Sequence, residues 1–222
     1  MNYSDSENIK AQKLLLRKKI KFELKLFSQG GKAAAESESV CRVFLQSDAY
    51  RNASAVFAYM NMPSELDVSS VIAVAFRDGK EVCIPRIVPG TNQMDFFYLD
   101  GSLPLEKQTE PGVFQIREPK LSLKKVSLGE FFPENAVILV PGLLFSADGK
   151  RLGRGKGFYD RYIAAIPAEK KALLCGTGFS FQLASDIPVE PHDRLLDCVI
   201  CGGKMYFPGT MDFEKISNAE NQ

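Results

Sequence analysis

The chain has 222 residues, 45% of them hydrophobic, so it can bury a core without disulfides or structural metals. Its 28 Lys and Arg residues nearly balance its 27 Asp and Glu residues, which argues against a protein that coats duplex nucleic acid. No stretch approaches the roughly 18 consecutive apolar residues that a membrane-spanning helix needs. We therefore expect neither a nucleic-acid partner nor a membrane partner.

The N-terminal sequence and the cysteines indicate the cellular compartment. Residues 1–7 are polar and acidic, and they lack the basic and apolar regions of a secretory signal. The five cysteines are an odd number, and Cys83 and Cys175 stand in apolar runs typical of buried strands. Because unpaired buried thiols are typical of reduced proteins, we expect a cytoplasmic location.

Apolar periodicity predicts helices and strands in alternating order. The first half should hold helices at 7–29 and 33–45, a strand at 53–59, a helix at 67–76 and strands at 81–85 and 94–99. The second half should hold strands at 113–116 and 136–140, a helix at 158–166, and strands at 172–175 and 196–201.

This order of elements predicts an α/β fold. We expect a single domain over residues 1–207, with a mostly parallel, Rossmann-like sheet flanked by helices and preceded by the long N-terminal helix. Residues 208–222 are predicted to form a polar C-terminal tail.

The most informative segment is a glycine-rich, basic loop that joins a predicted strand to a predicted helix. Three glycines alternate with two cations there, in the order Gly153-Arg154-Gly155-Lys156-Gly157. Glycines let backbone N–H groups approach a ligand closely, and the following helix presents its positive end. Cationic side chains stand at four nearby positions: Lys150, Arg151, Arg154 and Lys156. The loop is therefore predicted to bind phosphate, with a solvated basic surface turn as the alternative.

Two familiar phosphate motifs do not fit this loop. A Walker A loop needs glycine five positions before Gly155, where Lys150 stands, and Ser or Thr after Lys156, where Gly157 stands. The dinucleotide fingerprint needs a third glycine at the position of Phe158. The loop therefore belongs to another class of phosphate site.

Asp160 lies in the first turn of the predicted helix after the loop. A carboxylate there is favoured by the helix macrodipole without any ligand. Beside bound phosphates, the same carboxylate would repel them unless a cation lay between, which suits Mg²⁺. Residue chemistry alone leaves both roles open.

The segment from Pro141 to Tyr162 resembles the signature of the 5-formyltetrahydrofolate cyclo-ligases, also called 5,10-methenyltetrahydrofolate synthetases. It reads Pro-Gly-Leu-Leu-Phe and then Asp-Gly-Lys-Arg-Leu-Gly-Arg-Gly-Lys-Gly-Phe-Tyr-Asp-Arg-Tyr. Other landmarks follow in the family's order over residues 13–197. One departure is Phe158, where the family usually has tyrosine. The phenylalanine retains an aromatic stacking role but lacks the hydroxyl.

The resemblance implies that the loop binds ATP and carries the catalytic groups. The catalytic residues would be Arg154, Lys156 and Tyr159. ATP would be bound by these three residues and by loop and N-terminal residues, namely Lys13, Arg17, Arg151, Gly153, Gly155, Gly157 and Phe158. Lys13 and Arg17 are also i, i+4 neighbours at the margin of the apolar stripe of the first helix, which suits cations that reach into a cleft.

The resemblance places a folate substrate and a metal at the same site. Met60 and Glu65 follow the first predicted strand, where ligands of open α/β sheets bind, and Glu65 could accept paired N–H bonds from a pterin. Arg154, Lys156 and Phe158 would contact this substrate too. Asp160 and Asp193 would hold Mg²⁺, with Asp197 as the rival of Asp193. Arg86 and Glu118 match family positions, but no role follows for them.

The implied activity is the ATP- and Mg²⁺-dependent conversion of 5-formyltetrahydrofolate, with or without a polyglutamate tail, to 5,10-methenyltetrahydrofolate. The resemblance implies that the formyl oxygen is phosphorylated by ATP and that N10 then closes the ring, with release of ADP and phosphate. Such chemistry needs positioning and charge neutralisation more than a nucleophile. We expect a monomer. The alternatives are an α/β sugar-phosphate isomerase or CoA transferase, and an RNA-binding module built on the basic first helix.

Overall fold

The computed structural model describes residues 3–170, 172–190 and 193–209 of the chain. Residues 210–222, most of the predicted polar tail, lie outside these ranges. The helices are α1 (Tyr3–Gln29), α2 (Ala33–Gln46), α3 (Asp48–Arg51), α4 (Ser69–Arg77), α5 (Leu105–Gln108) and α6 (Phe158–Ala165), with the 3₁₀ turns η1 (Val113–Gln115) and η2 (Ser180–Gln182).

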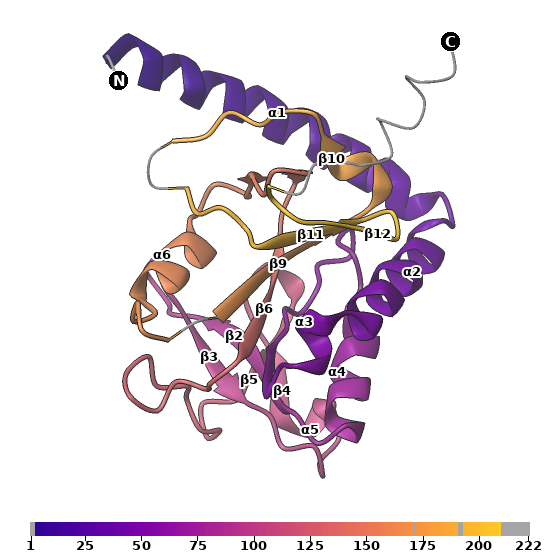
Figure 1. Cartoon of the computed structure of the whole chain (residues 1–222), viewed down its shortest axis with the longest axis vertical. Helices are drawn as coiled ribbons and strands as arrows, with labels where there is room; N and C mark the ends of the chain where they lie inside the picture. The colour runs from indigo at the N-terminus through magenta and orange to yellow at the C-terminus, as the bar shows by residue number, and fades with distance from the viewer. Residues whose placement is uncertain (1–2, 171, 191–192, 210–222) are drawn as a thin grey trace.

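A large, mostly parallel sheet forms the centre of the fold (Figure 1). Its strands are β1 (Ala55–Phe57), β2 (Glu81–Ile87), β3 (Met94–Tyr98), β6 (Ala136–Pro141), β9 (Ala172–Gly178), β11 (Cys198–Cys201) and β12 (Lys204–Tyr206). Within the described ranges their order is β12-β11-β9-β6-β1-β2-β3. The five inner strands are parallel, and the edge strands β3 and β12 are antiparallel. The predicted α/β fold with a mostly parallel sheet is therefore confirmed.

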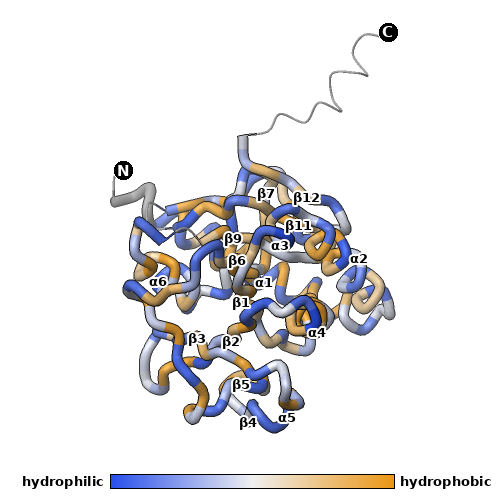
Figure 2. The backbone as a smooth tube through the Cα atoms, turned by 60° about the horizontal axis from the view of Figure 1, so that its bottom comes forward, coloured by the Kyte–Doolittle hydropathy of each residue, from blue (hydrophilic) through white to orange (hydrophobic). Residues whose placement is uncertain are grey.

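Helices cover both faces of this sheet. Successive residues of each strand point to opposite faces, so each strand contributes side chains to both packed layers. In β1, Val56 packs into the cluster that α1, α2 and α4 complete, whereas Ala55 and Phe57 pack into the cluster that contains Tyr162 of α6. In the hydropathy-coloured tube, the flanking helices carry both hydrophobic and hydrophilic stretches (Figure 2). The longer helices bury one face in the two hydrophobic clusters and expose the other.

Helix α1 runs across the top of the view in Figure 1 and packs on the fold through one stripe. Ile20 and Leu24 are buried in that stripe, while Lys18 and Lys25 are exposed. Two glycines follow the helix, and Gly31 has φ of +76°, a left-handed conformation that commonly ends helices. The packing holds the N-terminal half of α1 beside the carboxyl ends of the central strands.

The predicted strand at 113–116 is wrong. Residues 113–115 form the 3₁₀ turn η1, in which Phe114 has φ of +58°. The turn belongs to the hairpin of β4 (Thr109–Pro111) and β5 (Arg117–Pro119). The run contains three apolar residues, but a left-handed residue cannot continue an extended chain.

The loop after β6 contains regular structure that the sequence did not predict. Strands β7 (Leu144–Ser146) and β8 (Arg151–Leu152) form an antiparallel pair, and β10 (Leu183–Ala184) extends it to a small second sheet. This sheet holds the base of the glycine-rich loop, so only residues 153–157 remain irregular before α6.

None of the helices in the described ranges is long and apolar enough to cross a membrane. The five cysteines are buried and free, namely Cys41, Cys83, Cys175, Cys198 and Cys201.

Candidate active site

A pocket of about 390 Å³ lies at the carboxyl ends of the parallel strands. It opens where the chain order reverses between β1 and β6, which is where ligands of open α/β sheets bind. The segment after β1 and the segment after β6 both line it. Every residue that the sequence analysis assigned to the site lines this one pocket: Lys13, Arg17, Met60, Glu65, Arg151, Gly153, Arg154, Gly155, Lys156, Gly157, Phe158, Tyr159, Asp160 and Asp193.

The glycine-rich loop turns sharply at two of its glycines. Gly155 has φ of +101° and Gly157 has φ of +68°, which L side chains rarely adopt. Gly157 is the residue that caps the start of α6, so the loop delivers the chain directly into the helix. The loop glycines and the first residues of α6 therefore line the same pocket as the loop cations.

Helix α1 is tied to this loop by Arg17. Its Nε donates a hydrogen bond to the carbonyl oxygen of Gly153 at 3.0 Å. A Cβ at Gly155 would lie 3.4 Å from the same Nε, so the loop passes closely under the guanidinium. The Arg17 side chain is thereby held at the pocket, as predicted from its place on the helix.

Lys13 lies one turn earlier on α1 and is only 3% exposed. Its Nζ contacts the carboxylates of Glu190, at 2.9 Å, and Asp193, at 2.5 Å. The predicted marginal cation is thus buried at the pocket and paired with acids from the segment before β11. Asp193 also accepts a hydrogen bond from the backbone N–H of Glu190 at 2.7 Å.

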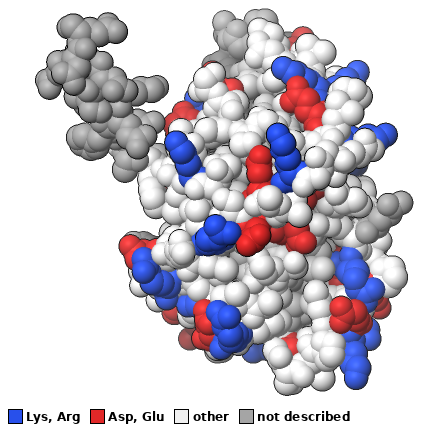
Figure 3. Space-filling model, turned by 90° about the vertical axis from the view of Figure 1, so that its right-hand side faces the viewer, with Lys and Arg blue, Asp and Glu red and all other residues white. Residues whose placement is uncertain are grey.

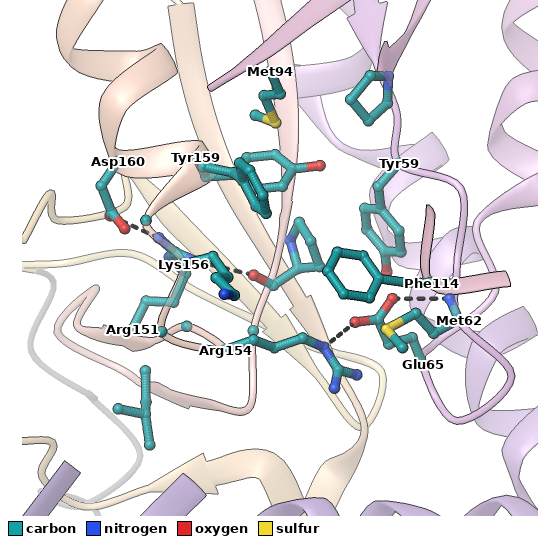
Figure 4. A pocket seen from close by; sticks show the side chains of 18 of the residues that line it. Tyr59, Met62, Glu65, Met94, Phe114, Arg151, Arg154, Lys156, Tyr159 and Asp160 are labelled. Carbon is teal, nitrogen blue, oxygen red and sulfur yellow. Dashed lines mark hydrogen bonds and ion pairs between the residues drawn. The ribbon is translucent and has the colours of Figure 1, made fainter. Parts of the chain in front are cut away.

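Arg154 reaches across the pocket to the segment after β1 (Figure 4). Its Nε donates to Oε1 of Glu65 at 2.6 Å, and Oε2 of Glu65 accepts the backbone N–H of Met62 at 2.9 Å. The Nη2 atom of Arg154 is buried, and within the described residues it has no hydrogen-bond partner. Buried donors in proteins are nearly always satisfied, so this atom indicates a polar ligand.

Arg151 is engaged within the protein. It is buried, donates from Nη1 to the carbonyl oxygen of Pro141 at 3.1 Å, and pairs through Nη2 with Oδ1 of Asp160 at 2.7 Å. The pair joins β8 to the first turn of α6. Asp160 keeps its Oδ2 without a hydrogen bond among the described residues, so one of its oxygens can face a ligand.

Two carboxylates that line the pocket are the candidate ligands of a magnesium ion. Within the described ranges no three His, Cys, Asp or Glu side chains are grouped closely enough to hold a metal. Mg²⁺ commonly takes only one or two carboxylates and completes its shell with waters and phosphate oxygens. Asp160 and Asp193 both line the pocket, whereas Asp197 does not and accepts the backbone N–H of Leu174 at 2.7 Å.

Apolar and aromatic side chains also line the pocket. Its members include Tyr59, Met60, Met62, Met94, Phe114, Ile116, Phe158 and Tyr159. In Figure 4, Phe114 lies between the loop cations and the group of Tyr59, Met62 and Glu65. Burial raises the pKa of Tyr159 far above its ordinary value of 10, so its hydroxyl stays protonated and can only donate or accept hydrogen bonds.

Sequence reasoning missed three further features of the pocket. Glu190, the second partner of Lys13, sits in a loop with no motif around it. Phe114 was assigned to a strand, and its exposure of 51% with a positive φ follows only from the structure. Glu118 is 4% exposed and lines the pocket, although only its likeness to family positions drew attention to it.

Fold and site together define an α/β protein with a cation-lined cleft at its topological switch point. Residues 9–202 match the family described as the 5-formyltetrahydrofolate cyclo-ligase family. The 5-formyltetrahydrofolate cyclo-ligase of Saccharomyces cerevisiae is 31% identical over 86% of this chain and 96% of its own length. The enzyme of that name from Mus musculus is 33% identical over 68% of this chain and 74% of its own length.

Two solved structures have the same fold. The 5,10-methenyltetrahydrofolate synthetase of Aquifex aeolicus superposes with a TM-score of 0.72 at 24% identity, covering 90% of this chain and 94% of its own. The synthetase of that name from Mycoplasma pneumoniae gives 0.61 at 20% identity, covering 85% and 97%. The chain belongs to the 5-formyltetrahydrofolate cyclo-ligase family.

Proposed function

We propose that the chain converts 5-formyltetrahydrofolate to 5,10-methenyltetrahydrofolate, using ATP and Mg²⁺ and releasing ADP and phosphate. The observation that carries this proposal is the composition of one pocket, which is lined both by cations (the cationic wall) and by apolar and aromatic side chains (the aromatic wall). A cationic wall suits a triphosphate, and an aromatic wall suits a flat pterin. Membership of the family supports a formylated folate as the substrate.

The cationic wall would bind the phosphates of ATP. Arg17 and Lys156 line it, and the buried Nη2 of Arg154 needs an acceptor that a phosphate oxygen would provide. The N–H groups of the loop from Gly153 to Gly157 and the start of α6 add neutral donors for the same anion. Lys13 and Arg151 would support this wall from behind, through Asp193 and Asp160.

The aromatic wall would bind the folate. Phe114 and Phe158 offer ring faces for stacking, and Met60 adds a polarizable, adaptable contact. Both oxygens of Glu65 already accept one hydrogen bond, and each has a second lone pair. We propose that these lone pairs accept the amino-pyrimidine edge of the pterin.

The reacting atoms would meet between the two walls. When bound, ATP supplies the phosphoryl group that turns the formyl oxygen into a leaving group. Arg154 and Lys156 would hold that oxygen and neutralise the negative charge that builds up during transfer. Tyr159 stays protonated because of its burial, so it would donate a hydrogen bond at this point and would not act as a base.

Asp160 and Asp193 would hold Mg²⁺. A hard cation between these carboxylates and the phosphates removes the repulsion that two acids would otherwise exert on ATP. Lys13 Nζ lies 2.5 Å from Oδ2 of Asp193, so the lysine would stay beside the metal and hold this carboxylate in place.

The test is a reaction mixture of purified protein, 5-formyltetrahydrofolate, ATP and Mg²⁺. We expect the near-ultraviolet absorbance of the methenyl product to rise only when all three components are present. ADP release should depend strictly on the folate. A folded protein that gives no product would contradict the proposal.

The same assay separates the other activities considered from the sequence. A sugar-phosphate isomerase or a CoA transferase would use the loop without hydrolysing ATP, so no folate-dependent ADP would appear. An RNA-binding module would need a basic surface, but the face in Figure 3 mixes Lys and Arg with Asp and Glu. Its binding would also weaken steeply with salt.

We further propose that the protein works as a monomer in the cytoplasm and accepts folates with or without a polyglutamate tail. The five buried free cysteines support a reducing compartment. Size-exclusion chromatography with in-line light scattering should give the mass of one chain.

Replacing Phe114 by alanine should raise the KM for 5-formyltetrahydrofolate about tenfold, a loss of about 1.4 kcal/mol of binding. The side chain is half-exposed, so the free energy of unfolding should change little. Phe131→Ala is the matched control, because Phe131 is 80% exposed and does not line the pocket. Equal KM values for the two variants would remove Phe114 from the folate site.

A further inference from the structure

The loop that carries Phe114 is not held by its own apolar side chains. Val113 is 48% exposed and Phe114 is 51% exposed. Phe114 also has φ of +58°, a conformation that costs free energy for an aromatic residue and persists only where the surroundings impose it. Some other contact must therefore fix residues 111–117 over the pocket.

Polar contacts from the central sheet meet the base of this loop. Arg86, on β2, donates from Nη1 to Oε1 of Glu110 at 2.6 Å and to the carbonyl oxygen of Pro119 at 2.7 Å. Arg86 thus contacts both strands of the hairpin, since Glu110 is on β4 and Pro119 is on β5. The next residue of β2, Ile87, donates its N–H to Oε1 of Glu118 at 3.3 Å.

Arg86 neutralises two facing carboxylates of the hairpin. Glu110 and Glu118 are directly opposite each other in the β4–β5 register, where like charges destabilise a strand pair. Arg86 lies between them, with Nε 3.9 Å from Oε2 of Glu118. Since Glu118 is 4% exposed, solvent does little to screen the repulsion.

Glu118 also packs against the turn at Gly112. A Cβ at Gly112 would lie 2.3 Å from Cγ of Glu118 and 2.7 Å from its Oε2, so the carboxylate side chain fills the space that a larger residue would need. The N–H of Gly112 donates to the carbonyl oxygen of Ile116 at 2.8 Å and closes the turn around Phe114. A continuous series of contacts therefore runs from Arg86 through Glu118 to Gly112.

We infer that Arg86 and Glu118 are positioning residues, which hold the loop 111–117 so that Phe114 faces the pocket. They act on the ligand through Phe114 rather than by contact with the reacting atoms. The inference rests on the proposed function only where it names the folate as the ligand.

The chain has no tryptophan, so Phe114→Trp provides a single fluorescent reporter on the loop. In this background, Arg86→Met should lower the fluorescence anisotropy of the ligand-free protein, because the loop moves more freely. In the native Phe114 background, Arg86→Met should raise the KM for 5-formyltetrahydrofolate about tenfold and change the KM for ATP by less than about twofold. Arg42→Met is the control, since Arg42 forms an exposed pair with Glu38 on α2.

Two conservative variants keep the test decisive if Arg86→Met fails to fold. Arg86→Lys keeps the charge but loses the planar fork, so it should lower the anisotropy by a smaller amount. Glu118→Gln keeps the side-chain shape and should shift anisotropy and KM in the same direction. Unchanged anisotropy in the folded Arg86 and Glu118 variants would overturn the inference, whether or not the folate is turned over. A raised KM without a change in anisotropy would also overturn it, because Glu118 would then contact the ligand itself.

Discussion

Replacing Lys156 by alanine should lower kcat by about 100- to 1000-fold, or about 2.7–4 kcal/mol, the usual loss when one charge-stabilising donor is removed. Lys156 is exposed at the pocket, and its Nζ makes no ion pair within the described part of the chain. Its role should therefore lie in binding the transferred phosphoryl group, with little contribution to folding. Single-turnover kinetics beside a thermal melt would measure both quantities.

Lys150 provides a matched control in the same loop. It does not line the pocket, and its Nζ pairs with Asp148 at 3.0 Å and Asp186 at 2.7 Å on the outer side. Lys150→Ala should keep near-normal turnover, because Lys150 does not line the pocket. The variant should also fold, because surface ion pairs contribute only about 0–1 kcal/mol to stability. If Lys156→Ala were as active as Lys150→Ala, the loop would not be the phosphate site.

Asp160→Asn should raise the Mg²⁺ concentration needed for half-maximal rate by about tenfold or more, since a neutral amide binds a hard cation less strongly than a carboxylate. The amide oxygen can still accept the hydrogen bond that Arg151 donates at 2.7 Å, so the variant should fold. Asp193→Asn should raise the requirement in the same way. Titration of the initial rate with Mg²⁺ at fixed ATP measures the effect.

Asp197→Asn is the control for both metal variants. Asp197 lies outside the pocket and holds the backbone N–H of Leu174. Its replacement should leave the Mg²⁺ requirement unchanged, even if the melting temperature falls. A larger shift for Asp197→Asn than for Asp193→Asn would reverse the choice between these two aspartates.

The site was predictable from the sequence where its residues are adjacent along the chain. The order Gly153-Arg154-Gly155-Lys156-Gly157 places cations and backbone donors together without any tertiary information, and all five residues line the pocket. The alternation of helices and strands similarly predicted the parallel sheet. Local pattern therefore accounts for both the fold class and the centre of the site.

Contacts between distant segments were not predictable in this way. Arg151 pairs with Asp160 from the short strand β8. A strand of two residues is too short to show a periodicity in the sequence, so it was not predicted. Phe114 was placed in a strand from its apolar surroundings, whereas it has a left-handed conformation in the turn between β4 and β5. Burial and anchoring by remote residues decided these details.

The pairing of Lys13 with Glu190 has a consequence for synthesis of the protein. The two residues are 177 positions apart, so the lysine leaves the ribosome long before its acidic partners exist. At about 5–20 residues per second, the delay is roughly 10–35 s. During this time the buried position of Lys13 cannot form, and α1 can dock only through its apolar stripe and the hydrogen bond from Arg17 to Gly153. Nascent chains that end before Glu190 should therefore carry a less firmly attached first helix, and the side of the pocket around Lys13 should form last.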